Sequence, residues 1–144
     1  MNISKFTQKS VQAVQDLEKV AYEYGNQEVE QEHLLYALLT QEDSLILKLI
    51  EKMEINKDYF INTVKKALDA KVKVSGGDLR FGQYLNKSLV NAENEAKAMG
   101  DEYVSVEHLF LSLLTQPSPS MKKIFNEFGI TRASFIQALS TVRG

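Results

Sequence analysis

The sequence predicts an all-α domain of about eight helices. Helix breakers are scarce, with 2 Pro and 7 Gly among 144 residues, and such residues usually mark turns and loops. Apolar residues recur at three- and four-residue spacings, which is typical of amphipathic helices. Residues 71–74 alternate like a strand, but the run is short, has no partner run and leads into Ser-Gly-Gly-Asp at 75–78. We therefore interpret it as a linker.

The sequence also repeats itself when it is shifted by 75 residues. The shift gives 17 identities without a gap, beginning with Phe6 on Phe81. The identities cluster, because Glu-His-Leu at 32–34 falls on 107–109 and Leu-Leu-Thr-Gln at 38–41 falls on 113–116. Internal repeats at a fixed spacing determine architecture. The shift predicts one domain of two four-helix units related by a pseudo-twofold axis, with the following limits: domain 1–144, repeat one 1–70, linker 71–78 and repeat two 79–144.

The first helix of each unit is the longest. In repeat one, the segment from Phe6 to Tyr24 carries one apolar stripe, formed by Val11, Val14, Leu17, Ala21 and Tyr24. A glycine follows in both units, Gly25 or Gly100, as expected for the residue that ends a helix. The second helix opens at Glu30 or Ser105 and continues through the Leu-Leu-Thr-Gln sequence.

The remaining helices are shorter and have recognisable starts. We expect the third over Ser44 to Lys52 and over Ser120 to Asn126, with Ser118-Pro119 as a favourable beginning. The fourth begins at Asn56 or Thr131 and ends near Leu68 or Val142. Both fourth helices show the hydrophobic-staple spacing, in which an apolar residue before the cap packs on one four residues after it. The staple residues are Ile55 with Phe60 and Ile130 with Phe135.

The composition excludes several classes of protein. Leu, Ile, Val and Phe make up 43 of the 144 residues, enough to bury a core. The net charge is −2, so no basic excess favours nucleic-acid binding. Cysteine is absent, which excludes disulfides and thiolate chemistry and suits the cytoplasm. The amino terminus does not resemble a signal peptide, and no run approaches the roughly 18 apolar residues of a membrane span.

Two Glu-His pairs, at 32–33 and 107–108, are the most suggestive polar residues. Adjacent residues point about 100° apart on a helix, so neither pair has the spacing of metal ligands. We expect the histidines to occupy half-buried capping positions in the first turn of the second helices. No nucleophile or phosphate-binding motif is present, which favours an interaction module over an enzyme. An enzyme would need Glu32 and Glu107 as an acid–base pair within about 5–10 Å.

The paired repeats, with Phe6-Thr7 near the start and Glu-His-Leu in both second helices, resemble the Clp N-terminal domain of AAA+ unfoldases. The opening Met-Asn-Ile-Ser-Lys-Phe-Thr-Gln-Lys-Ser, the Gly-Gly-Asp linker and the final Thr-Val-Arg-Gly are most similar to ClpB-type disaggregases. The resemblance implies a non-catalytic, cofactor-free and monomeric domain of a longer protein. It places ATP and hexamer formation in AAA+ domains outside this chain, and makes a DnaK-type chaperone a possible partner of the full-length protein.

For this domain the resemblance implies recruitment of unfolded or aggregated polypeptides through their exposed hydrophobic segments. The family's positions match Thr7, Asp101 and Glu107, and the alignment adds an apolar groove that includes Leu89. We expect client contact in the second half, which holds Leu89, Asp101 and Glu107. The halves also differ in charge, since residues 1–70 carry −4 and residues 71–144 carry +2.

A ClpC-type N-terminal domain is the alternative. The family resemblance then implies binding of adaptor proteins or phosphoarginine through a Thr and a Glu in each half, because paired carboxylates suit a guanidinium. Thr7, Glu32 and Glu107 match this pattern. The position equivalent to Thr7 in the second half holds Gly82, which departs from it.

Overall fold

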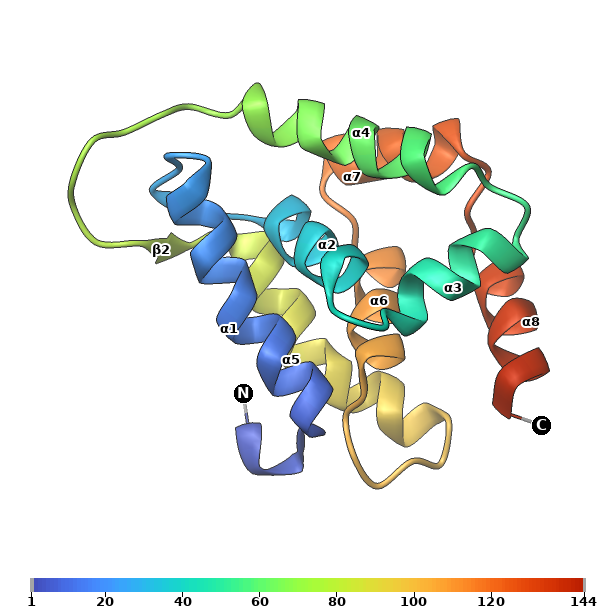
Figure 1. Ribbon diagram of the computed structural model, residues 1–144. Helices are drawn as coiled ribbons and strands as arrows, with labels where there is room; N and C mark the ends of the chain where they lie inside the picture. Colours follow the sequence, from blue (N-terminus) through green and yellow to red (C-terminus); the bar gives the residue numbers. More distant parts are fainter. Residues whose placement is uncertain (1, 144) are drawn as a thin grey trace.

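Eight α-helices and two strands of two residues each make up most of the regular structure in the computed structural model, which describes residues 2–143 (Figure 1). A 3-10 helix at Ile3–Lys5 precedes them. The helices are α1 (Gln8–Glu23), α2 (Gln31–Thr40), α3 (Leu45–Lys52), α4 (Lys57–Asp69), α5 (Gln83–Ala98), α6 (Val106–Thr115), α7 (Pro119–Glu127) and α8 (Arg132–Arg143). The predicted all-α class is confirmed.

The helix boundaries repeat with the same 75-residue shift as the sequence. It carries α1 onto α5 and α2 onto α6 at both ends, and the start of α4 onto the start of α8. Local capping explains several starts: Ser44, Asn56 and Ser118 each accept a hydrogen bond from the backbone N–H three residues on, at 3.0, 2.9 and 3.3 Å. The α1 helix begins later than predicted, at Gln8, because Thr7 serves as its N-cap.

Two short parallel pairings, which the sequence did not predict, join the halves reciprocally. Strand β1 (Glu28–Val29) pairs with β2 (Arg80–Phe81), and Phe6 forms a bridge with Val104. The 75-residue shift carries Phe6 onto Phe81 and Val29 onto Val104, so each half supplies the same two positions to the other half. Segments this short cannot show the alternation that identifies a strand in sequence.

The segment predicted as a linker, 71–78, contains no helix or strand. It passes beside the end of α1, where the Val74 N–H donates to the Gly25 carbonyl at 2.9 Å. The Asn26 side-chain amide donates to the Val72 carbonyl at 3.0 Å. The linker is therefore attached to the first half before it enters β2.

The core is shared by both halves. Helices α2 and α6 lie in the middle, with α1 and α5 on one side, α4 beside α7, and α3 beside α8 (Figure 1). Because α2 and α6 are covered from several sides, they are apolar around most of their circumference. Phe60 and Phe128 connect the halves with ring centroids 4.9 Å apart. No helix within residues 2–143 combines the length and apolar character that crossing a bilayer requires.

The prediction that Leu89 lines a surface groove is wrong. Its side chain is only 2% exposed and belongs to the hydrophobic core. Leu89 lies on α5, which packs along α6 and so turns this residue inward.

Candidate functional site

Both histidines cap helices, as the sequence predicted, but both are fully buried and not half-buried. In the first half, His33 Nδ1 accepts a hydrogen bond from the Glu30 backbone N–H at 2.9 Å, which places the proton of the neutral ring on Nε2. That nitrogen donates to Asn26 Oδ1 at 3.0 Å. Burial, assisted by the positive charge of Lys71, lowers the pKa of His33 to about 4. His33 is therefore neutral near pH 7.

His108 has the same backbone contact but a charged partner. Its Nδ1 accepts from the Ser105 backbone N–H at 2.8 Å, and its Nε2 lies 2.7 Å from Asp101 Oδ2. Arg143 lies 2.6 Å from the same oxygen and 3.3 Å from Glu107 Oε2. Burial raises the pKa of Asp101, but hydrogen bonds from Arg143 and His108 outweigh it and bring the pKa below its ordinary value. Asp101 and Glu107 thus share one guanidinium.

A cleft of about 360 Å³ opens where α1 of the first half meets α6 of the second. We call it the Thr7 cleft, and its lining residues are Thr7, Gln8, Lys9, Gln41, Asp43, Leu45, Ser105, Val106 and Glu107. The backbone of Thr7 is held against the second half, because its N–H donates to the Val104 carbonyl at 2.9 Å. Glu107 lies in the first turn of α6 and is 6% exposed.

The Thr7 cleft combines apolar walls with a polar rim. Leu45 and Val106 contribute the branched apolar side chains. The rim is braced by two hydrogen bonds between α1 and the α2–α3 loop: Lys9 Nζ donates to the Glu42 carbonyl at 2.6 Å, and Gln41 Nε2 donates to the Lys9 carbonyl at 2.8 Å. Such a site can hold an apolar side chain while polar groups at the rim bind a peptide backbone.

The equivalent position in the other half is filled by the chain itself. Gln31 stands where the Thr7 cleft has Val106, and it is 1% exposed. Its Nε2 donates to Ser88 Oγ at 2.8 Å and to the Gln116 carbonyl at 2.9 Å. Its Oε1 accepts from the Ser118 backbone N–H at 2.8 Å. This glutamine therefore ties α2, α5 and the start of α7 together.

Glu32, the equivalent of Glu107, has its own partners. It is 2% exposed, accepts a hydrogen bond from Ser120 Oγ at 2.6 Å and lies 3.3 Å from Lys71 Nζ. Burial lowers the pKa of Lys71, but Glu32 and Glu30 outweigh it and raise the pKa above its ordinary value. Glu32 and Glu107 share none of these partners, and only Glu107 lines the Thr7 cleft.

The structure thus brings together part of the predicted set of residues. Thr7 and Glu107 line one cleft, and Arg143 connects Glu107 to Asp101. Glu32 is bonded within the other half. Sequence reasoning missed Leu45 and Val106, although the repeat carried a signal. These apolar residues align with the polar Ser120 and Gln31.

Comparisons with known proteins agree with this architecture. The family model described as the Clp repeat (R) N-terminal domain matches residues 5–139. The chaperone protein ClpB of Nitratidesulfovibrio vulgaris is 38% identical over 150 aligned positions, and that of Clostridium tetani is 40% identical over 149. Each alignment covers 100% of this chain and 17% of the relative, so the chain spans about a sixth of the length of these relatives.

Solved structures share the fold at lower identity. The Hsp104 N-terminal domain from Candida albicans superimposes with a TM-score of 0.83 at 22% identity, covering 97% of this chain and 92% of that one. A ClpV N-domain in complex with a VipB peptide gives a TM-score of 0.73 at 22% identity, covering 96% and 89%.

Proposed function

Because the chain belongs to the Clp repeat N-terminal domain family and is ClpB-like over its whole length, we propose that it recruits polypeptide substrates for a ClpB-type disaggregase. The bound elements would be exposed hydrophobic segments of unfolded or aggregated proteins. The AAA+ ring with its ATP, assembly into a hexamer, cooperation with a DnaK-type chaperone and a cytoplasmic location are part of the same proposal. They concern a protein as long as the ClpB relatives, of whose length this chain spans about a sixth.

One observation carries the proposal. Thr7 and Glu107, which the family resemblance implies for substrate contact, line the same cleft as the apolar Leu45 and Val106. A cleft with apolar walls and a polar rim suits a hydrophobic side chain on an extended backbone. The peptide held by the related ClpV N-domain gives independent support that this fold can bind peptides.

Recruitment can be tested with a fluorescein-labelled unstructured peptide rich in Leu and Phe, titrated with the 144-residue chain and followed by fluorescence anisotropy. We expect Leu45→Glu to weaken binding about tenfold, since it places a charge on the apolar wall. Leu47→Glu is the matched control, because it alters the same residue type on α3 outside the Thr7 cleft. Equal affinities for both variants would rule out this cleft as the recruitment site.

The ClpC-type alternative is favoured by a different observation. Asp101 and Glu107 already hold the guanidinium of Arg143, which is the group that phosphoarginine recognition requires. Of the two Glu positions, Glu107 is the one that bonds a guanidinium, because Glu32 is bonded to Ser120 and Lys71. This reading predicts saturable binding of free phosphoarginine that is lost in Glu107→Gln and retained in Glu32→Gln. A flat calorimetric titration of the unaltered chain would exclude it.

A further inference from the structure

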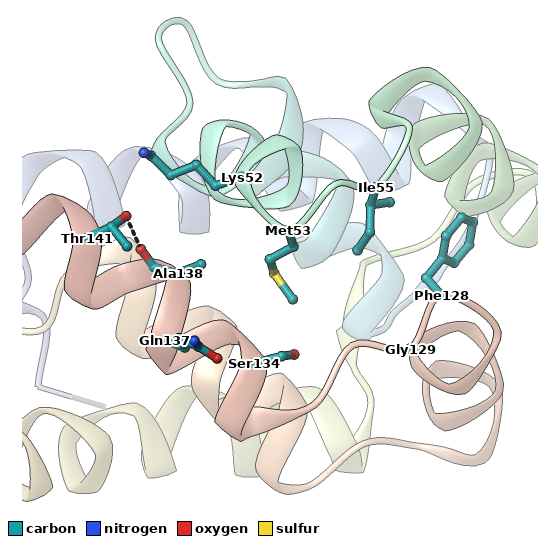
Figure 2. Close-up of a pocket in the computed structure, with 9 residues that line it drawn as sticks. All are labelled: Lys52, Met53, Ile55, Phe128, Gly129, Ser134, Gln137, Ala138 and Thr141. Atoms are coloured by element: carbon teal, nitrogen blue, oxygen red, sulfur yellow. Dashed lines mark hydrogen bonds between the residues drawn. The ribbon is translucent and has the colours of Figure 1, made fainter.

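A second cleft, of about 380 Å³, lies between the end of α3 and helix α8 (Figure 2). We call it the α3/α8 cleft, and it is lined by Lys52, Met53, Ile55, Phe128, Gly129, Ser134, Gln137, Ala138 and Thr141. Figure 2 shows Met53 and Ile55 reaching from the first half toward the α8 residues Ser134 and Ala138. None of its residues belongs to the Thr7 cleft.

The 75-residue shift identifies an equivalent place in the fold, where the protein supplies an aromatic side chain of its own. It carries Tyr59 onto Ser134 and Met53 onto Phe128, so the equivalent lies between the end of α7 and helix α4. There the ring of Tyr59 packs edge-on against Phe128, with centroids 5.3 Å apart and an interplanar angle of 76°. Tyr59 Oη lies 3.3 Å from Glu127 Oε2. The first half thus provides an aromatic side chain, 59% exposed, at this place.

Ser134 cannot supply a ring to the α3/α8 cleft in the same way. Its short side chain bends back to the start of α8, where Ser134 Oγ accepts from the Thr131 backbone N–H at 3.0 Å. Thr131 Oγ1 accepts from the Ser134 backbone N–H at 3.0 Å in return. This reciprocal capping stabilises the helix end. The α8 side of the cleft therefore contributes no ring, and Phe128 is the aromatic side chain among the lining residues.

The charge of the lining residues also indicates which ligand the α3/α8 cleft would bind. Lys52 is the equivalent of Glu127, so a cation stands where the equivalent place has the carboxylate beside the Tyr59 hydroxyl. The salt bridges found within residues 2–143 do not include Lys52. We propose that the α3/α8 cleft binds an aromatic side chain of another polypeptide, next to a carboxylate that pairs with Lys52. This is a second site, independent of the Thr7 cleft.

The probe is the peptide acetyl-Gly-Asp-Tyr-Asp-Gly-amide, titrated into the 144-residue chain and followed by amide NMR shifts. We expect shifts at Met53, Gly129 and Ala138, and none with a peptide that has Ala in place of Tyr. Ser134→Tyr supplies the missing ring within the chain and should weaken binding about fivefold. Lys52→Glu should weaken it about threefold and improve binding of a peptide with Lys in place of both Asp.

Tyr59→Ser is the matched control. It removes the ring beside Glu127, so the Lys-flanked peptide should gain a site there. The Asp-flanked peptide should still bind at the α3/α8 cleft, with a change confined to the effect of losing the Tyr59 ring that packs against the lining residue Phe128. Circular dichroism checks folding of Ser134→Tyr, and the exposed Lys52→Glu change provides a test that does not depend on it. The proposal is overturned if neither Ser134→Tyr nor Lys52→Glu alters binding, if the shifts fall only around Thr7, or if they appear with rising protein concentration alone.

Discussion

Acid should destabilise this domain through His33. The pKa of His33 is about 4 in the folded chain and about 6.5 in an unfolded one. Between these values the unfolded chain binds a proton at His33 that the folded chain does not. The free energy of unfolding therefore falls as the pH drops from 6.5 toward 4, and this contribution is fully present above pH 6.5. Below pH 4 both states are protonated and the loss is complete.

The size of the loss follows from the two pKa values. Each unit of difference corresponds to about 1.4 kcal/mol, so a difference of roughly two to three units removes about 3 kcal/mol. Domains of this size are typically stable by about 5–15 kcal/mol. Loss of the His33 contribution is thus a large part of the total, and urea denaturation followed by far-ultraviolet circular dichroism at several pH values will measure it.

Asn26→Asp tests whether His33 is the source of the pH dependence. The change gives His33 the kind of carboxylate partner that His108 already has in Asp101. A carboxylate raises the pKa of the imidazole, so the stability of the variant should fall less steeply with acid. Loss of the side-chain donor to the Val72 carbonyl lowers stability at every pH by about 1 kcal/mol and leaves the slope unaffected. Parallel curves for the two proteins between pH 6.5 and 4 would refute the reasoning.

Three further changes test the roles of single side chains, with urea denaturation as the measurement. Thr7→Ala removes the N-cap of α1 and should lower stability by about 1 kcal/mol; an unchanged midpoint would contradict that role. Leu89→Glu places a charge in the core and should lower stability by more than about 4 kcal/mol; a folded variant of native stability would instead support the hypothesis that Leu89 lines a surface groove. Gln31→Val, which copies Val106, removes three hydrogen bonds and should lower stability by about 2 kcal/mol; a neutral effect would show that Gln31 is not needed to close its half.

Helix starts were predictable because the determining contacts are local. Ser44, Asn56 and Ser118 each cap a backbone N–H only three residues away, so a short stretch of sequence contains the whole interaction. Repetition in the sequence likewise predicted which helices correspond. The paired strands were not predictable, because β1 and β2 are two residues each and find their partners in the opposite half.

The same distinction between local contacts and contacts across the two halves applies to the site residues. The caps made by His33 and His108 were predicted from their position in the first helical turn. The burial of Leu89 could also have been predicted from the sequence, because Leu89 aligns with Val14 in the apolar stripe of the first helix. Val14 is buried in the structure. What sequence could not provide was the meeting of Thr7 with Val106, which depends on how the two halves pack.

The Thr7 cleft and the α3/α8 cleft share a cause in the repeat. At each cleft, one repeat has a small or apolar side chain at a position where the other repeat has a larger side chain that makes internal contacts. At the Thr7 cleft, Val106 occupies the position equivalent to the hydrogen-bonded Gln31. At the α3/α8 cleft, Ser134 occupies the position equivalent to Tyr59. Both clefts also draw their walls from both halves, α1 with α6 and α3 with α8. A single repeat would therefore have neither cleft, and divergence between the repeats, rather than either repeat alone, creates the surfaces available for binding.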